Sequence, residues 1–82
     1  MILEIFACDD GLCVDLQSAV DAALCELGLA GEATVYRITD PAIMVGRGVW
    51  RAPGLAVNGR IVSRGKPLSV ERVVELIRAA AR

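Results

Sequence analysis

The stretch Ile5-Phe6-Ala7-Cys8-Asp9-Asp10-Gly11-Leu12-Cys13 places two cysteines where an apolar segment gives way to a helical pattern. Residues 2–6 are apolar apart from Glu4, and this pattern predicts a strand covered on both faces. From residue 12 onward, leucine, valine and alanine recur at helical spacing, which predicts an amphipathic helix. Because the unpaired N–H groups of a helix N-terminus favour a thiolate, Cys8 and Cys13 are the first candidates for chemistry.

The segments that follow carry clear turn and cap signals. Asp10 is a suitable N-cap for the first helix, and Gly28 or Gly31 is expected to end it. Residues 33–38 are rich in β-formers and predict a second strand. Asp40-Pro41 is an N-cap followed by the helical position that proline tolerates best, so a short helix is expected to about residue 45.

The last third of the chain predicts a hairpin and a helix. Asn58-Gly59 lies between the apolar runs 55–57 and 60–62, and a type I′ turn needs positive φ at both central residues. Ser69 is the expected N-cap of a final helix whose apolar side begins at Val70. The order strand, helix, strand, helix, strand, strand, helix predicts an α/β fold with a mixed four-stranded sheet and helices on both faces.

Length and composition exclude several classes of protein. The chain has 82 residues, which predicts a single domain over 1–82. A net charge of −1 and only three aromatic residues argue against a nucleic-acid partner. The start of the chain resembles no signal peptide and no apolar run is long enough to span a membrane, so we expect a cytoplasmic protein without a membrane partner.

Charge is unevenly distributed along the sequence. Up to Asp40 the chain carries eight acidic residues and a single base, Arg37. After Asp40 it carries eight bases against Glu71 and Glu75. Two interpretations are open: the charges intersperse on the folded surface, or they form a bipolar surface that steers a partner.

The three cysteines are expected to be free, catalytic or metal-binding, because reducing compartments disfavour structural disulfides. The chain has no histidine, so it lacks the commonest zinc ligand, and we predict no metal and no cofactor. Cys25 lies on the polar side of the first helix. It is expected to be a partly exposed filler residue, with an intermolecular disulfide or a metal thiolate as the alternative.

The order of elements, the thiols at the first strand–helix junction and the run Ala52-Pro53-Gly54-Leu55-Ala56-Val57-Asn58-Gly59 resemble the thioredoxin fold in its smallest form. The chain is most similar to the short prokaryotic thioredoxin/glutaredoxin-like proteins often called redox-active disulfide proteins. The resemblance implies that Pro53 is a cis-proline beside the thiols and that the backbone of Ala52 pairs with an extended substrate. The alternative is a trans proline that starts an edge strand.

The first motif departs from the family pattern Cys-x-x-Cys. Aligned without gaps, Cys13 takes the place of the second cysteine and Asp10 that of the first. With a two-residue insertion, Cys8 takes the first place and the motif becomes Cys-x-x-x-x-Cys. Asp10 then acts as a helix cap or as a general base. Acidic neighbours oppose the helix dipole at Cys13, and a Cys8–Cys13 disulfide depends on geometry that sequence does not fix.

The resemblance implies a thiol–disulfide oxidoreductase, or a diverged relative of one, that acts on a protein disulfide or thiol. Cys13 and Cys8 are then the working pair, and Ala52 with Pro53 docks the substrate. Trp50, close before Pro53, is either a packing residue or a substrate contact. The alternative function is a non-catalytic thioredoxin-fold module that binds a protein or a thiophilic metal.

Overall fold

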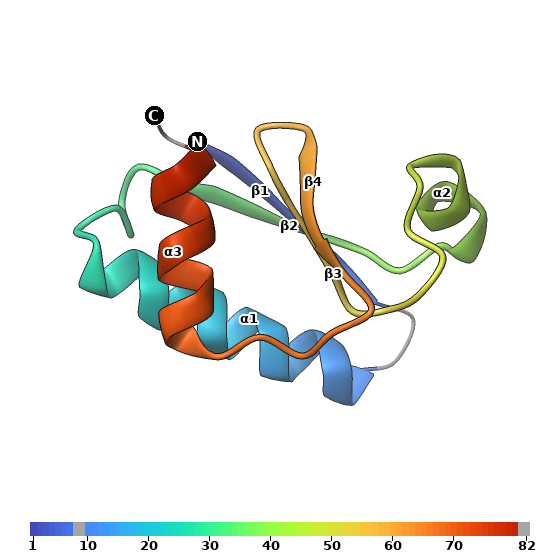
Figure 1. Ribbon diagram of the computed structural model, residues 1–82, viewed down its shortest axis with the longest axis horizontal. Helices are drawn as coiled ribbons and strands as arrows, with labels where there is room; N and C mark the ends of the chain where they lie inside the picture. The colour runs from blue at the N-terminus through green and yellow to red at the C-terminus, as the bar shows by residue number, and fades with distance from the viewer. Residues whose placement is uncertain (8–9, 81–82) are drawn as a thin grey trace.

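The computed structural model describes residues 1–7 and 10–80, apart from the side chain of Asp10. The described elements run in the order β1 (Ile2–Phe6), α1 (Asp10–Glu26), β2 (Thr34–Ile38), α2 (Pro41–Gly46), β3 (Gly54–Val57), β4 (Arg60–Arg64) and α3 (Val70–Ala80), as Figure 1 shows. This order is the predicted one.

The four strands form one mixed sheet in the order β2-β1-β3-β4. β1 pairs in parallel with β2, from Ile2 opposite Thr34 to Phe6 opposite Ile38. β3 runs antiparallel to both β1 and β4, and a register shift beside Leu55 marks a bulge in the hairpin. The predicted α/β fold with a mixed four-stranded sheet is therefore confirmed.

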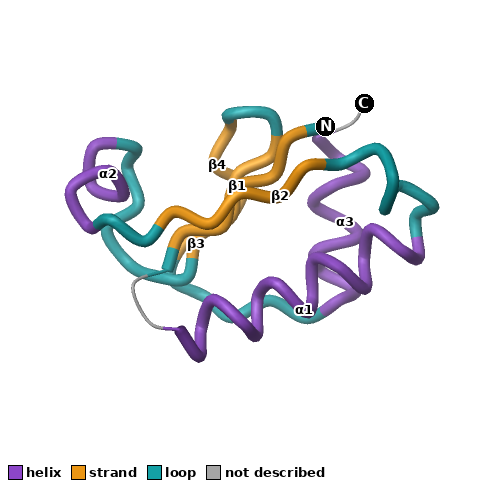
Figure 2. Tube along the Cα trace, turned by 180° about the vertical axis from the view of Figure 1, so that it is seen from behind, coloured by secondary structure: helices purple, strands orange, loops and turns teal. Residues whose placement is uncertain are grey.

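Two helices cover one face of the sheet, and the main core lies between them and the strands. Figures 1 and 2 show α1 and α3 on the same side of the sheet. The buried residues of this core are Leu3, Ile5, Ala7, Cys13, Leu16, Ala19, Val20, Ala23, Leu24, Leu55, Val57, Val73, Val74 and Ile77. Side chains alternate between the faces of a strand, so Leu3 and Ile5 point into this core while Phe6 points to the opposite face.

The opposite face is covered only at one end. Met44 of α2 packs there against Phe6 and Ala56, and Val49 completes this smaller cluster. At the other end of β1, Ile2 is 47% exposed. The prediction that residues 2–6 are covered on both faces is therefore wrong at the start of the strand, because α2 has only six residues and does not reach it.

An ion pair fixes the end of α2 to the central strand. Arg47, the C-cap of α2, donates to both carboxylate oxygens of Glu4 at 2.9 Å. The same guanidinium lies 5.3 Å from the centre of the Phe6 ring, within the range of a cation–π contact. Planar bidentate pairing of this kind gives geometric specificity as well as energy, so Arg47 orients α2 over β1.

The predicted caps Asp40 and Ser69 and the predicted turn Asn58-Gly59 occupy their expected places. The side chain of Asp40 accepts from the N–H of Ala42 at 2.9 Å, and Ser69 Oγ accepts from the N–H of Arg72 at 3.2 Å. Asn58 and Gly59 have φ values of 51° and 85°, as a type I′ turn requires. These local signals set the ends of α2, β3, β4 and α3.

The first helix ends in a Schellman motif. Gly28 has a φ of 71°, and its N–H donates to the carbonyl of Cys25 at 3.1 Å. The N–H of Leu29 donates to the carbonyl of Leu24 at 2.8 Å. Gly28 is therefore the glycine that ends α1. Within residues 1–7 and 10–80, no helix combines the length and the apolar character that crossing a membrane requires.

Candidate functional site

Cys13 lies in the first turns of α1 and is only 3% exposed. It stands three residues before Leu16 and seven before Val20, and at helical spacing these positions share one face. All three belong to the main core. The thiol of Cys13 is therefore a buried group that faces the sheet.

Two of the predicted site residues cannot be placed. Cys8 lies outside the described residues, and so does the side chain of Asp10. The backbone of Asp10 forms the first residue of α1, so the helix begins at this position instead of after it. Asp10, the residue in the position of the first cysteine of Cys-x-x-Cys, is thus the first residue of the helix, three residues before the buried Cys13.

Pro53 and Ala52 lie in the loop that leads into β3. The Ala52–Pro53 peptide bond is cis, and Pro53 is buried. The N–H of Gly65 donates to the carbonyl of Pro53 at 2.9 Å, which ties this loop to the end of the hairpin. Ala52 is half-buried and packs against both hydrophobic clusters, including the one that holds Cys13. The structure therefore brings the proline loop and the buried thiol to the same region of the core.

Two glycines make room for side chains that pack closely around this loop. A Cβ atom on Gly54 would come within 2.9 Å of Val49 Cγ1, shorter than carbon atoms tolerate. Gly65 has a φ of 77°, and a Cβ atom there would meet Cβ of Arg51 at 3.2 Å. Glycine at positions 54 and 65 thus allows the segments on either side of Pro53 to pack tightly.

A small hollow of about 50 Å³ lies beside Pro53. Leu12, Asp15 and Leu16 of α1 form one wall, and Pro67 and Leu68 of the segment between β4 and α3 form the other. The hollow is mostly apolar, with one carboxylate at Asp15. Leu12 and Leu16 lie on either side of Cys13 in the sequence of α1, so the hollow places Pro53 close to the turn of the helix that holds the buried thiol.

Trp50 is 75% exposed and belongs to neither hydrophobic cluster. The adjacent Val49 is the residue that packs, with 1% of its surface exposed. Of the two interpretations open for Trp50, the packing role is therefore excluded. A large exposed indole beside the proline loop is available for contact with a partner.

Cys25 lies near the far end of α1 and is exposed, in agreement with the expectation from its helical face. Twelve residues separate it from Cys13, which corresponds to about 18 Å along a helix. A disulfide between these two thiols is excluded because it requires Cα atoms within about 7 Å. Cys25 is therefore not part of the site at the N-terminal end of α1.

Sequence reasoning did not identify the segment from Gly65 to Leu68 as part of the site. In the sequence, Lys66-Pro67 follows the predicted hairpin and indicates only that the second strand ends there. Pro67 and Leu68 nevertheless form a wall of the hollow beside Pro53. Their sequence signal is an apolar pair between a strand and a helix cap, where polar turn residues are more usual.

Comparison with known proteins agrees with the architecture. Among curated proteins, no sequence matches the chain. A family model described as a thioredoxin domain matches residues 7–78, a range that begins directly after β1 and includes nearly all of α3. The match includes Cys13, the Ala52–Pro53 loop and the Asn58-Gly59 hairpin. The chain therefore belongs to the thioredoxin-domain family.

Proposed function

We propose that this protein is a thiol–disulfide oxidoreductase in which Cys8 and Cys13 form the redox couple. One observation carries the proposal: Pro53 shares a small hollow with Leu12 and Leu16, which lie on either side of the buried Cys13 in α1. A thiol close to the proline loop suits exchange with a disulfide held on that loop. A reducing compartment such as the cytoplasm would keep the couple in its dithiol form.

The burial of the Cys13 side chain supports an order in which the two thiols act. With 3% of its surface exposed, Cys13 is poorly accessible to an incoming disulfide. We therefore assign the first attack to Cys8. Its thiolate bonds to one substrate sulfur, and the other substrate sulfur leaves as a thiolate. The thiolate of Cys13 then attacks the Cys8 sulfur of the mixed disulfide and releases the second substrate thiolate.

The products are a reduced substrate and a Cys8–Cys13 disulfide, so two electrons pass from the protein to the substrate. The two thiol protons of the couple are transferred through solvent to the released substrate thiolates. A dithiol reductant from outside the protein must then return two electrons and two protons for a second cycle. The reverse sequence oxidises a substrate dithiol.

The loop before β3 supports the docking of an extended substrate. No hydrogen bond of the Ala52 backbone is formed within residues 1–7 and 10–80. A backbone segment of a substrate can therefore pair with Ala52. Trp50, two residues earlier, offers an exposed ring for further contact.

The test is reduction of a protein disulfide with dithiothreitol as the electron source. Cys8→Ser is expected to abolish turnover, and Cys13→Ser is expected to trap a mixed disulfide through Cys8. Cys25→Ser is the matched control and should leave the rate unchanged, because this thiol lies at the far end of α1. Full activity in either Cys8→Ser or Cys13→Ser would refute the proposal.

A second function is favoured by the carboxylate in the motif. Asp10 occupies the position of the first family cysteine, and the only described thiol near it is buried. Such a chain is suited to bind a protein through the Pro53 loop without exchanging disulfides. The described residues hold no group of three His, Cys, Asp or Glu side chains placed for a metal ion, so a thiophilic metal site would need Cys8.

A single substitution separates these two functions. Asp10→Cys restores Cys-x-x-Cys at the start of α1. If the parent lacks reductase activity and Asp10→Cys gains it, the native role is binding. If the parent is active and Cys8→Ser inactivates it, the protein is the oxidoreductase proposed above.

A further inference from the structure

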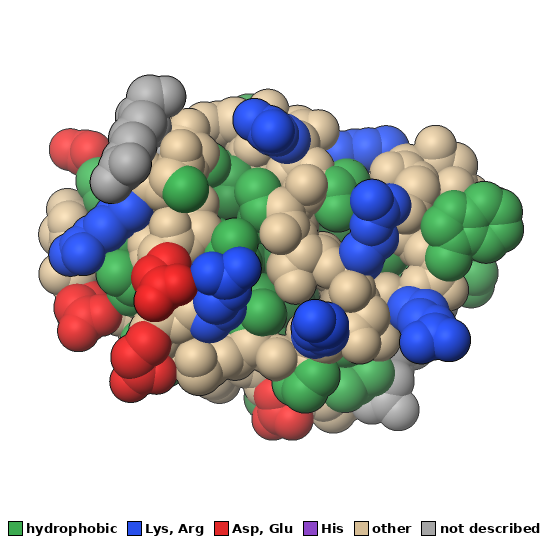
Figure 3. All heavy atoms as spheres, viewed as in Figure 1, with side chains coloured by type: hydrophobic (Ala, Val, Ile, Leu, Met, Phe, Trp, Pro, Cys, Tyr) green, Lys and Arg blue, Asp and Glu red, His purple; other side chains and the backbone are tan. Residues whose placement is uncertain are grey.

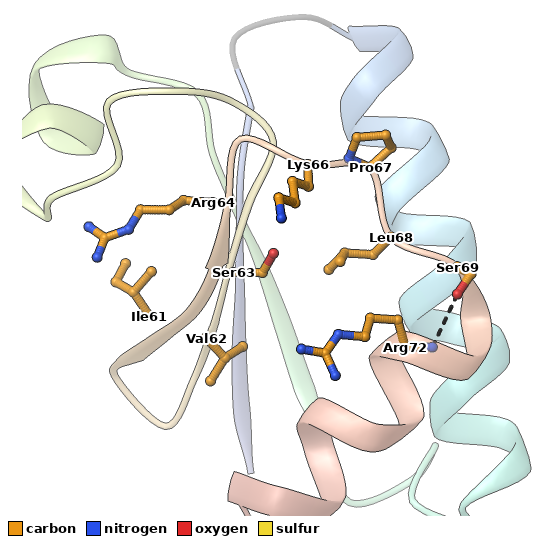
Figure 4. Close-up of a pocket in the computed structure, with 9 residues that line it drawn as sticks. All are labelled: Ile61, Val62, Ser63, Arg64, Lys66, Pro67, Leu68, Ser69 and Arg72. Atoms are coloured by element: carbon orange, nitrogen blue, oxygen red, sulfur yellow. Dashed lines mark hydrogen bonds between the residues drawn. The ribbon is translucent and has the colours of Figure 1, made fainter.

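A basic groove of about 610 Å³ lies between β4 and the start of α3. Figure 4 shows the side chains of Val62, Ser63, Lys66, Leu68 and Arg72 directed toward a common space between the strand and the helix. Val62 and Leu68 are half-buried and form an apolar floor. Lys66 and Arg72 supply positive charge at its walls.

The charge of the groove comes from Lys66 and Arg72 and not from Arg64. Figure 4 shows Arg64 directed away from the other lining residues, and its Nη1 donates to the carbonyl of Gly48 at 2.8 Å. Nη1 of Arg72 contacts Glu75 at 2.9 Å, but both side chains are more than half exposed. The remaining guanidinium donors of Arg72 can therefore take a carboxylate of a ligand.

Acidic side chains are absent from the lining of the groove in the described part of the chain. On the face shown in Figure 3, basic side chains lie across the middle of the molecule and on the side of α2, while acidic and basic side chains lie together on the side of α3. An anionic ligand is favoured in the groove, and a cationic one is disfavoured.

The groove runs beside an edge strand. β4 is the last strand in the order β2-β1-β3-β4, so only β3 pairs with it among the described elements. A strand edge presents backbone N–H and C=O groups to which an extended chain can pair. An extended polypeptide suits this place better than a compact ligand.

The groove lies next to the hollow beside Pro53. Pro67 and Leu68 line both spaces. A chain that rests on Pro53 can therefore pass over these two residues and reach Lys66 and Arg72. On the far wall of the hollow it meets Asp15, which disfavours acidic groups at that end.

We propose that the groove between β4 and α3 binds an extended acidic segment of the substrate protein, on one side of the disulfide presented at Pro53. The proposal rests on the proposed function for the identity of the substrate. The binding step itself needs no thiol. The acidic side chains of the segment would pair with Lys66 and Arg72, and its backbone would lie along β4.

The test uses a fluorescent eight-residue peptide without cysteine, in which glutamate alternates with threonine. A second peptide carries glutamine at every glutamate position. Fluorescence anisotropy measures the affinity of both peptides for the full chain at low ionic strength. The variant Lys66→Gln/Arg72→Gln removes the two groove charges. The matched control Arg60→Gln/Arg78→Gln removes two exposed charges outside the groove.

The full chain is expected to bind the glutamate peptide about fivefold to tenfold more tightly than the glutamine peptide, the effect of two exposed ion pairs. The groove variant should lose this preference, and the control should keep at least half of it. If the full chain binds both peptides with nearly equal affinity, the proposal is overturned. It is also overturned if the groove variant and the control lose the preference for glutamate to the same extent. Circular dichroism establishes that both variants are folded.

The result of the peptide-binding test is independent of the result of the reductase assay. Cys8→Ser/Cys13→Ser is expected to bind the glutamate peptide as the full chain does, because the binding step needs no thiol and Cys13 is not among the residues that line the groove. If the full chain prefers the glutamate peptide but has no reductase activity, the proposed acidic-segment site is supported and the proposed oxidoreductase function is refuted. If the chain has reductase activity but no preference between the peptides, the oxidoreductase function stands and the proposed acidic-segment site is refuted.

Discussion

Arg47 pairs with Glu4 through two hydrogen bonds of 2.9 Å, across 43 positions of the chain. The Glu4 side chain is 15% exposed, on the central strand of the sheet. The hydrogen bonds from Arg47 lower the pKa of Glu4 below its ordinary value of 4.5, and they outweigh the opposing effect of burial. This pair couples the position of α2 to the protonation of one carboxylate.

The Glu4–Arg47 pair predicts a defined loss of stability in acid. Because the pKa of Glu4 is lower in the folded state, the pair stabilises the fold above about pH 4.5. That contribution is lost as the pH falls through the folded-state value. Glu4→Gln should therefore lower the thermal midpoint of unfolding at pH 7. The difference in thermal midpoint between this variant and wild type, called the gap below, should disappear as the pH falls below 4.5. Thermal unfolding followed by circular dichroism across pH measures the gap.

Glu75→Gln is the control for this prediction. Its carboxylate also pairs with an arginine at 2.9 Å, but both partners are mostly exposed. Exposed pairs contribute little to stability, so this variant should follow wild type at every pH. A gap between Glu4→Gln and wild type that stays constant down to pH 3 would contradict the assignment.

Gly54→Ala should destabilise the protein by about 1–3 kcal/mol, the usual effect of overpacking. The added Cβ would lie 2.9 Å from Val49 Cγ1, so either the strand or Val49 must shift. Gly46→Ala is the matched control, since its added Cβ meets no atom within 4 Å and the residue lies in α2. Urea unfolding should show Gly46→Ala unchanged or more stable. Equal effects of the two substitutions would show that the close approach at Gly54 is unimportant.

Asn58 combines a positive φ with a bond to the first strand. Its Oδ1 accepts from the N–H of Ile2 at 2.8 Å, and its own N–H donates to the carbonyl of Ile2 at 2.7 Å. Asn58→Asp retains the acceptor, Asn58→Gly retains only the backbone freedom, and Asn58→Ala retains neither. The free energy of unfolding should fall in that order, with about 1–2 kcal/mol lost in Asn58→Ala. If Asn58→Ala were as stable as Asn58→Asp, neither the positive φ of Asn58 nor its side-chain hydrogen bond to Ile2 would stabilise the fold.

Trp50 is predicted to contribute to binding and not to stability. Trp50→Ala should change the free energy of unfolding by less than about 0.5 kcal/mol, as expected of an exposed position. Val49→Ala, at the neighbouring buried position, should lose about 1–3 kcal/mol. In the reductase assay, Trp50→Ala should raise KM for a protein disulfide with little change in kcat. A strongly destabilised Trp50→Ala variant would show that the ring packs after all.

Local signals in the sequence predicted most of the fold. Asn58-Gly59 fixed the hairpin, and Asp40-Pro41 and Ser69 marked the starts of α2 and α3, because these residues act through their own backbone neighbours. Contacts between distant segments were not predicted. The sequence gives no sign that Arg47 reaches Glu4, since that pair depends on the packing of α2 over β1.

The site was predicted less completely than the fold. The burial of Cys13 was not predicted, because its place in the motif indicates a working thiol, although its helical spacing with Leu16 and Val20 is typical of a shared apolar face. The exposure of Trp50 was left open by the sequence, because Val49 beside it is equally apolar. The groove at Lys66 and Arg72 arises only when α3 packs beside β4.

The midpoint potential of the Cys8–Cys13 couple is the most direct test of the proposed oxidoreductase. Thiol trapping followed by mass spectrometry across a series of redox buffers measures it. The account predicts a reversible two-electron transition between about −180 and −300 mV, with Cys25 outside the couple. The absence of a Cys8–Cys13 disulfide at every potential would contradict it.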